Sequence, residues 1–203
     1  MREALDATLA ELRRRVPAAA GLSRDDLQRT RDQVAGELGP TARMEEIRAA
    51  AFRRTLEDLG SPDSRFADEL TRFYLEARFR EMRLYDDVVP ALEALGGYEL
   101  GLVSNGNSYP ERVGLDRYFS FVLFAHDHGV AKPAAAFYGA VLATANCGPH
   151  EMIHVGDSIE NDVIAAQALG IRAVWLNRDR QNTKSGAWAE IHSLAELPAL
   201  VGC

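Results

Sequence analysis

The chain has 203 residues, of which 47% are hydrophobic and 26% are charged, and its formal net charge is −7. Such a composition is typical of a globular protein with one large domain or one domain plus an insertion, and it excludes an intrinsically disordered chain. The acidic balance argues against nucleic acid or an acidic membrane as a partner, because both attract a basic protein face.

The first 84 residues are rich in Arg and Ala, and their apolar side chains recur at helical spacing. Ser23 and Thr41 precede acidic residues in the manner of helix N-caps, and loops are expected at 39–40 and 60–62. The N-terminal stretch is charged, and no run of about 18 apolar residues occurs, so we expect neither a signal peptide nor a membrane anchor. The sequence therefore predicts an α-helical domain over residues 1–84.

From Tyr85 onward, short apolar runs alternate with helical segments. The predicted strands are 99–104, 121–124, 152–156 and 173–177, the predicted helices are 87–95, 110–117, 135–146 and 159–169, and a short strand and a helix are expected after residue 177. Apolar strands that alternate with helices form a parallel sheet covered on both faces. We therefore predict an α/β fold with a doubly wound, Rossmann-like parallel sheet over residues 85–203, with ligands at the carboxyl ends of its strands.

The first of these strands ends in Ser104-Asn105-Gly106-Asn107-Ser108. A hydroxyl followed by free backbone N–H groups that lead into a helix can hold a phosphate or another oxyanion. The same residues would also make an ordinary turn and N-cap. We predict that Ser104, Asn105 and Gly106 bind an anion.

The second strand is followed by a lysine, Lys132, directly before Pro133. Because the residue before a proline is held out of the helical region, this side chain can project into the crevice at the strand ends. Taken alone, such a lysine would be solvated surface. His126 and His128 lie just before it, but consecutive residues rarely converge on one ion, so we do not predict a metal site there.

The third strand runs into three acids, in the stretch IHVGDSIENDV. Asp157 follows the strand directly and Asp162 lies about 1.4 helical turns later, so the two carboxylates can face one crevice. Mg²⁺ takes one or two carboxylates together with waters and phosphate oxygens. Helix capping would explain one of the acids but less easily all three, so we favour a metal site at Asp157 and Asp162. His154 is interpreted as a buried, hydrogen-bonded histidine.

Taken together, the three strand ends resemble the haloacid dehalogenase-like (HAD) hydrolase superfamily. The matching segments span 85–178 and read LGLVSNGNS, VAKPAAAFY and HVGDSIENDVIAAQALGIRAVWLNR, while residues 1–84 resemble an α-helical cap. The resemblance implies that Ser104 and the adjacent backbone bind phosphoryl oxygens and that Lys132 offsets charge on them and on the nucleophile. It also implies that Asp157 ligates Mg²⁺ and that Asp162 contributes through a water or behind Asp157.

One motif of the family is absent from the sequence. Family members carry the nucleophilic aspartate after an apolar strand that precedes the cap, and Asp6 is no substitute because the residues before it are charged. In the family this strand lies between those that end at Ser104 and Asp157, so its absence predicts a gap in the sheet with two unpaired edges. We expect the biological protein to begin upstream of Met1, which translation of the preceding DNA would test, and the chain as given to lack phosphatase activity.

The sequence thus favours a Mg²⁺-dependent HAD-like hydrolase, a phosphatase acting on a small phosphorylated metabolite. The missing motif leaves open a catalytically inactive phosphate-binding or interaction protein. A haloacid dehalogenase needs no metal and has no reason to build the acidic cluster, so we favour it less. The excess of arginines in 1–84, Arg78 among them, could meet an anionic substrate, but we favour solvated helix faces. The substrate, the specificity residues of the cap and the oligomeric state do not follow from the sequence.

The two cysteines bear on the compartment. Cys147 and Cys203 lie far apart and are too few for a disulfide framework or a zinc cluster. They indicate a reducing, cytoplasmic environment.

Overall fold

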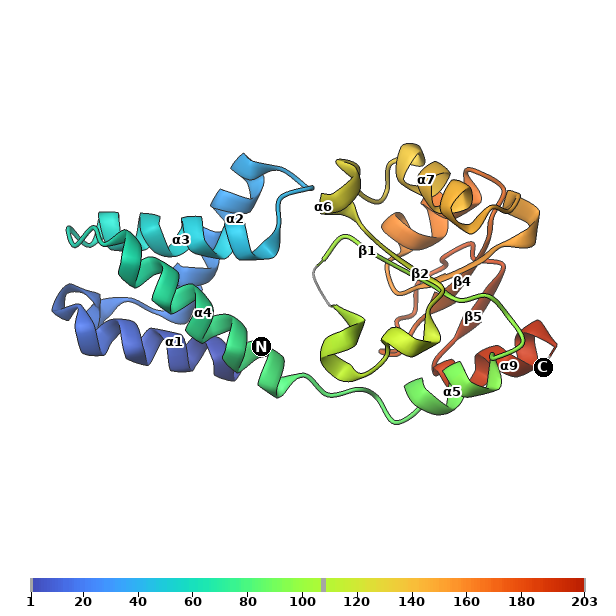
Figure 1. Cartoon of the computed structure of the whole chain (residues 1–203), viewed down its shortest axis with the longest axis horizontal. Coiled ribbons are helices and arrows are strands. Elements are labelled where there is room, and N and C mark those ends of the chain that lie inside the picture. Colours follow the sequence, from blue (N-terminus) through green and yellow to red (C-terminus); the bar gives the residue numbers. More distant parts are fainter. Residues whose placement is uncertain (1, 107–108, 203) are drawn as a thin grey trace. The chain divides into compact units, whose positions relative to one another are not determined.

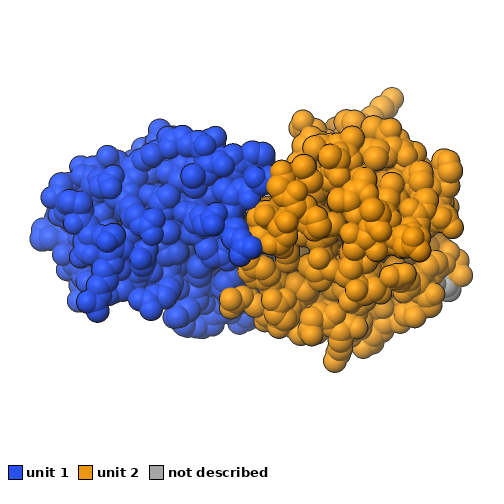
Figure 2. Space-filling model, turned by 45° about the horizontal axis from the view of Figure 1, so that its top comes forward, with its two compact units in different colours: residues 1–83 blue, residues 84–203 orange. Residues whose placement is uncertain are grey.

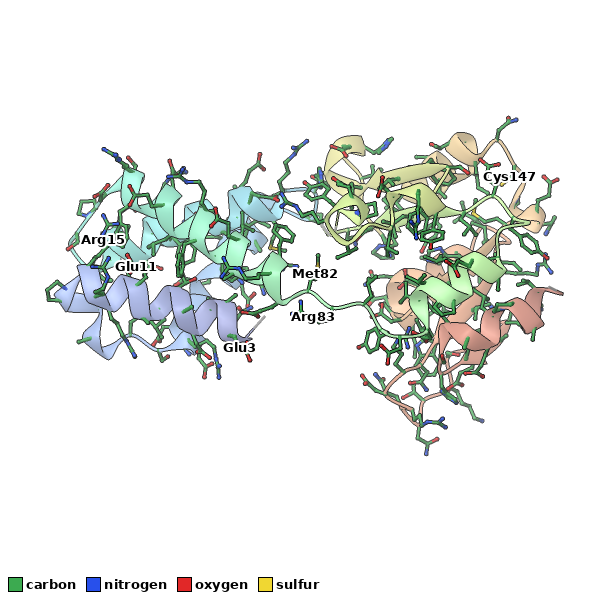
Figure 3. The ribbon with its side chains drawn as sticks, turned by 60° about the horizontal axis from the view of Figure 1, so that its bottom comes forward. Glu3, Glu11, Arg15, Met82, Arg83 and Cys147 are labelled. Carbon is green, nitrogen blue, oxygen red and sulfur yellow. The ribbon has the colours of Figure 1, made fainter. Side chains whose placement is uncertain are left out.

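The chain forms two compact units in a computed structural model that describes residues 2–106 and 109–202. Unit 1 comprises Met1–Arg83 and unit 2 comprises Leu84–Cys203, each in its own colour in Figure 2. The sequence places this boundary one residue later. Met82 and Arg83 follow the last helix of unit 1 in an extended segment that leads into unit 2 (Figure 3).

Unit 1 is built from helices. They are α1 (Arg2–Arg15), the short turn η1 (Pro17–Gly21), α2 (Arg24–Leu38), α3 (Met44–Asp58) and α4 (Ser64–Glu81). Ser23 caps α2 as predicted, because its hydroxyl accepts a hydrogen bond from the backbone N–H of Asp26 at 3.2 Å. Thr41 is not a cap. Instead α3 begins after Arg43, whose backbone N–H donates to the Glu46 carboxylate at 3.1 Å.

The core of unit 1 lies between these helices. Helix α4 packs against α1 and α3, and α2 packs against α3. Each helix turns one apolar stripe inward, as amphipathic helices do. The largest fully buried side chains of the unit are Leu12, Val34, Phe52, Leu56, Leu70 and Tyr74. Burial of an apolar side chain of this size stabilises a fold by about 1.5–3 kcal/mol.

Unit 2 alternates strands with helices (Figure 1). Its strands are β1 (Gly101–Ser104), β2 (Phe121–Phe124), β3 (Ile153–Gly156), β4 (Arg172–Leu176) and β5 (Ala189–Ile191). Its helices are α5 (Val88–Ala94), α6 (Ala125–His128), α7 (Ala135–Ala145), α8 (Ala165–Gln167) and α9 (Leu197–Val201). Short 3₁₀ turns connect these elements: η2 (Pro110–Val113), η3 (Asp116–Tyr118), η4 (Pro149–Glu151) and η6 (Leu194–Glu196). The segment η5 (Ile159–Ile164) is a wider, π-type turn.

The predicted helix over 110–117 is wrong, because two short turns, η2 and η3, take its place. Pro110 opens the first turn and Gly114 ends it in the left-handed region, at φ 71°. A left-handed residue stops a helix, and glycine adopts that conformation without a Cβ clash. Two successive short turns therefore replace the single helix that the sequence predicts.

The described strands form two parallel sheets. Strand β1 pairs with β2, with Ser104 opposite Phe124, and β4 lies between β3 and β5. No strand among residues 2–106 and 109–202 joins β1 to β3. The division falls where the sequence predicts a gap in the sheet, and it leaves one edge of β1 and one edge of β3 without a ladder partner in this part of the chain.

The core of unit 2 centres on β4. Ala173, Val174 and Trp175 in this strand are all at most 1% exposed, because helices cover both faces of its sheet. Phe137 and Tyr138 from α7 are also fully buried. Among the helices that the structure describes, none has the length and apolar character needed to cross a membrane.

Candidate functional site

The end of β1 is tied to the loop that contains Lys132. The side-chain amide of Asn105 donates to the carbonyl oxygen of Lys132 at 2.9 Å, and its carbonyl oxygen accepts from the Lys132 backbone N–H at 2.8 Å. Asn105 was predicted as an anion-binding residue, and in the structure its amide is used to hold Lys132 beside β1. Asn107 and Ser108 lie outside the described residues.

Ser104 ends β1 with its hydroxyl partly exposed. The hydroxyl oxygen accepts a hydrogen bond from the backbone N–H of Gly106 at 2.9 Å. Because the oxygen serves as the acceptor in this bond, the O–H remains available as a donor. The geometry leaves Ser104 able to donate to an oxyanion at the carboxyl end of the strand.

Lys132 forms a short ion pair with Asp162. The ammonium nitrogen lies 2.6 Å from Oδ1, and the two side chains are only 13% and 3% exposed. Lys132 follows β2 and Asp162 follows β3, so the pair joins loops that belong to different sheets. The bond between Lys132 and Pro133 is cis. One of the three ammonium protons serves Asp162, which leaves two donors for a ligand.

Asp162 is held as a buried carboxylate by three donors. Besides Lys132, His154 donates from Nε2 to Oδ1 at 3.0 Å, and the backbone N–H of Ser158 donates to Oδ2 at 3.0 Å. Burial by itself raises the pKa of Asp162, but hydrogen bonds from His154 and Lys132 and the lysine charge outweigh it and hold this pKa well below its usual value. The carboxylate is therefore charged across the physiological range.

The backbone around Asp162 is wider than an α-helix. In η5 the N–H groups of Asp162 and Val163 both point at the carbonyl oxygen of Ser158, at 2.8 and 3.3 Å. This π-type turn replaces the regular helix predicted over 159–169, and such turns occur often at functional sites. It folds the Asp162 side chain back over the strand end. A Cβ on Gly156 would lie 2.2 Å from the Asp162 Cγ, so only glycine fits there.

Tyr138 belongs to the same network and was not predicted. The Tyr138 hydroxyl donates to the carbonyl oxygen of Asn161 at 2.6 Å and lies 3.3 Å from His154 Nε2. Burial, together with the Asp162 charge, raises the pKa of Tyr138. His154 is buried and hydrogen-bonded, as expected. Tyr138 reads as a core residue of α7 in the sequence, and only the tertiary structure shows its polar contact.

Asp157 is exposed directly after β3. Its backbone carbonyl accepts a hydrogen bond from the Trp175 indole at 3.0 Å, which fixes the turn. Its carboxylate makes no hydrogen bond to any other residue that the structure describes. Asp157 lines a cleft of about 360 Å³ together with Tyr85, Gly156, Trp175, Leu176, Asn177, Arg178, Asp179 and Gln181. An uncommitted carboxylate therefore faces open space at the strand end.

The described residues provide only some of the ligands that a bound Mg²⁺ needs. Residues 2–106 and 109–202 contain no cluster of three or more His, Cys, Asp or Glu side chains that would enclose a metal ion. Asp157 is uncommitted, and Oδ2 of Asp162 accepts one hydrogen bond, which leaves a lone pair for a water. Mg²⁺ commonly binds through one or two carboxylates plus waters and phosphate oxygens. These residues suit Mg²⁺ held jointly with a phosphorylated ligand.

The positive charge of Arg178 in this cleft is compensated by Asp87. Arg178 pairs with Asp87 through two contacts of 2.9 and 3.1 Å and lies 4.1 Å from the centre of the Tyr85 ring. Ser193 and the backbone N–H of Leu194 also donate to Asp87, at 2.6 and 2.8 Å. The Arg178 hydrogen bond, foremost among these contacts, lowers the pKa of Asp87 to about 2.

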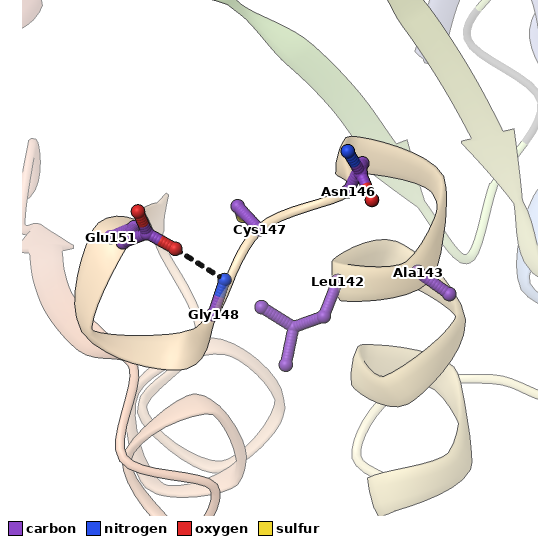
Figure 4. Close-up of a pocket in the computed structure, with 6 residues that line it drawn as sticks. All are labelled: Leu142, Ala143, Asn146, Cys147, Gly148 and Glu151. Atoms are coloured by element: carbon purple, nitrogen blue, oxygen red, sulfur yellow. Dashed lines mark hydrogen bonds between the residues drawn. The ribbon is translucent and has the colours of Figure 1, made fainter.

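A second hollow, of about 330 Å³, lies near Cys147 and is drawn in Figure 4. It is lined by the end of α7 and the turn η4, before β3 begins, and it contains none of the predicted site residues. Gly148 there donates its N–H to the Glu151 carboxylate at 2.8 Å. Burial raises the pKa of the Cys147 thiol, which disfavours the reactive thiolate. The hollow therefore lies at the opposite end of the strand from the candidate site.

Comparison with known proteins gives concordant results. A family model described as haloacid dehalogenase-like hydrolase matches residues 2–170. The chain is 34% identical over 143 residues to a phosphoserine phosphatase of Thermus thermophilus, a match that spans 65% of this chain and 55% of that protein. It is 32% identical over 192 residues to a ribulose-1,5-bisphosphate 5-phosphatase of Halopiger xanaduensis, which spans 86% of this chain and 80% of that protein.

Among solved structures, the fold is similar to that of a 2-haloacid dehalogenase from Pseudomonas syringae. The TM-score is 0.81 at 30% identity, and the superposition covers 98% of this chain and 89% of the other. The architecture of an α/β part with parallel strands joined to a helical part is thus shared along nearly the whole chain.

Proposed function

The chain belongs to the haloacid dehalogenase-like hydrolase family, and from that premise we propose that it is the phosphate-binding part of a Mg²⁺-dependent phosphatase. The proposed substrate is a small phosphorylated metabolite. We also propose that residues 1–84 act as its helical cap. Both sequence relatives described above are phosphatases of small metabolites, which supports this substrate class.

The observation that carries the proposal is the set of groups at the strand ends. Lys132 keeps two donors free, the Ser104 hydroxyl can still donate, and the carboxylate of Asp157 is open. A phosphoryl group needs donors around its oxygens, and catalysis of its transfer depends mostly on positioning and charge. Lys132 and Ser104 would bind and orient these oxygens. Asn105 would hold Lys132 in place through its two backbone bonds.

The charge balance favours a divalent cation. The Lys132 charge is shared with Asp162, and the Arg178 charge is shared with Asp87. A phosphate dianion beside the free carboxylate of Asp157 would be repelled unless a cation lay between them. Mg²⁺ when bound would neutralise the phosphoryl oxygens and draw electrons from phosphorus. Asp157 would hold it directly and Asp162 through a water.

The nucleophile is the missing component. An aspartyl-phosphate requires an aspartate carboxylate placed in line with the phosphorus atom. None of the strands β1–β5 is followed by the Asp-x-Asp pattern that supplies it in the family. We therefore propose that residues 1–203 on their own bind phosphate without turnover. This feature also supports the alternative of an inactive phosphate-binding or interaction protein.

A haloacid dehalogenase is the second enzyme class to consider, because the similar solved structure carries that name. Displacement of a halide from carbon requires no metal. Metal-free chemistry would leave the free carboxylate of Asp157 without a role. The same holds for Asp162, which is held charged after the same strand. This favours the phosphatase over the dehalogenase.

The test is hydrolysis of p-nitrophenyl phosphate with and without Mg²⁺, on residues 1–203 and on the product of the full reading frame. We expect no turnover by residues 1–203 and Mg²⁺-dependent turnover by the longer product if one exists. Asp157→Asn should abolish the Mg²⁺ dependence of phosphate binding, while Glu160→Gln, an exposed acid in the same turn, should not. Halide release from 2-chloropropionate without Mg²⁺ would contradict the proposal, as would phosphate binding that ignores Mg²⁺.

A further inference from the structure

Unit 1 contains a buried arginine without an acidic partner. Arg48, on α3, is only 3% exposed, and its Nε makes no hydrogen bond to any described residue. Nη2 donates a hydrogen bond to the Tyr74 hydroxyl at 3.1 Å, and the guanidinium lies 4.4 Å from the centre of the same ring. No carboxylate among the described residues forms an ion pair with this buried guanidinium.

The other charges near Arg48 make its position less favourable still. Burial lowers the pKa of Arg48, and the positive charges of Arg31 on α2 and Arg78 on α4 lower it further. Arg78 forms no ion pair with any carboxylate that the structure describes, and Arg31 is bound to Asp32. Arginines from three helices therefore lie close enough for the charges of Arg31 and Arg78 to act on Arg48.

Three other arginines of the unit form the ion pairs that Arg48 lacks. Arg15, Arg53 and Arg54 lie in or beside the same helices, and each forms an ion pair with a Glu or Asp at 2.6–2.8 Å. Charged side chains are almost never fully buried unless they are paired, because the loss of hydration costs several kcal/mol. A guanidinium kept buried with an unused N–H indicates that an external anion completes the cluster.

We propose that Arg48, Arg31 and Arg78 form an oxyanion-binding site in unit 1. The planar guanidinium of Arg48 would donate from Nε to a carboxylate or phosphate oxygen, the geometry in which arginine binds such groups best. Arg31 and Arg78 are only partly buried, so the cluster is open to solvent on their side. All three arginines belong to unit 1.

The proposed ligand is a free anion such as inorganic phosphate or a small carboxylate. Both present paired oxygens to a guanidinium, so they share the chemistry that the cluster recognises. The experiment below does not depend on the phosphatase proposal.

The test is an NMR titration of the ¹⁵N-labelled full chain. Acetate or inorganic phosphate is added at constant ionic strength, and the arginine Nε–H signals are followed. We expect the Arg48 signal, identified by its absence in Arg48→Lys, to shift and saturate. Arg48→Lys keeps the charge but loses the fork, so affinity should fall about ten- to a hundredfold. Arg53→Lys is the matched control on the same helix and should leave affinity unchanged.

Lys132→Ala distinguishes this site from the strand-end site. The Arg48 titration should persist in that variant even though the proposed phosphate site of unit 2 is impaired. No movement of the Arg48 signal with either anion, or an equal loss of affinity in Arg53→Lys, overturns the proposal.

Discussion

At the scale of single residues, the position of Asp162 depends on the absence of a side chain six residues earlier. The carboxylate folds back over Gly156 so closely that a Cβ there would lie 2.2 Å from Cγ. The backbone of Gly156 does not need a positive φ, so its glycine identity follows from this close approach alone. A methyl group at residue 156 would therefore displace Asp162 and disturb its hydrogen bonds with Lys132, His154 and Ser158.

We expect Gly156→Ala to lower the free energy of unfolding by about 1–3 kcal/mol, the usual cost of overpacking a filled site. Displacement of Asp162 should also weaken phosphate binding, because Lys132 loses its partner. Urea denaturation and phosphate titration measure the two effects. Gly139→Ala is the matched control: its Cβ would meet nothing within 4 Å, and alanine favours the helix there. Equal stability of the two variants would contradict the steric explanation.

At the scale of elements, one carboxylate joins three segments of unit 2. Asp87 precedes α5, receives Arg178 from the end of β4, and accepts hydrogen bonds from Ser193 and Leu194 at the start of η6. Folding lowers the pKa of Asp87 to about 2. The folded state therefore binds this proton less readily than the unfolded state, whose pKa has the ordinary value.

The pairing of Asp87 should stabilise the fold fully above about pH 4 and lose its effect as the pH falls toward 2. Asp87→Asn should remove this part of the acid dependence of the urea midpoint and lower stability at neutral pH. Asp86→Asn changes the exposed neighbouring acid and serves as the control. If the urea midpoint of Asp87→Asn fell at acid pH as it does in the unchanged chain, the contacts of residue 87 would not depend on its charge.

The elements differ in how well the sequence predicts them. Strands β1 to β4 are predicted within two residues at each end, because each is a continuous apolar run bounded by polar residues or glycine. The segment 110–117 and the turn around Asp162 are predicted wrongly as regular helices. In the first, Gly114 adopts a left-handed conformation, and in the second, two N–H groups share the Ser158 carbonyl. Helical periodicity carries no signal for either feature.

The site shows the same division between local and tertiary information. The sequence places Lys132 and Asp162 after two successive strands of the chain, and the structure brings them to 2.6 Å. Their roles toward a phosphoryl group, and those of Ser104 and Asp157, stay predictions. Tyr138 was missed because its polar contact spans two elements. The same holds for Arg48, whose burial no periodic pattern distinguishes from the exposed arginines beside it.

At the scale of the whole molecule, unit 2 contains two sheets without a shared hydrogen-bonded ladder in the described part of the chain. Strand β4 has a partner on both sides, whereas β1 and β3 each have one. The Lys132–Asp162 pair is a polar connection between the loops that follow the two sheets. Removing one partner of a buried pair typically costs about 3–5 kcal/mol.

We expect hydrogen exchange to be slowest for the amides of β4 and faster for those of β1, whose outer edge is unpaired. Lys132→Met should accelerate exchange in β1 and β2 more than in β4, because the ion pair no longer holds the first sheet against the second. Lys184→Met, at the other lysine of the chain and exposed, is the control. Uniform acceleration in all five strands would mean that the two sheets open as one unit.

The reliance on this ion pair has a consequence for how the strand ends are spaced. In a continuous sheet, hydrogen bonds fix neighbouring strands about 4.8 Å apart, and no solute alters that distance. Here no ladder joins β1 to β3 in the described part of the chain, and the Lys132–Asp162 pair adds an electrostatic contact to the apolar core that the two sheets share. The spacing therefore responds to whatever competes for Lys132, and an incoming anion that draws the ammonium away from Asp162 would change the width of the place it occupies.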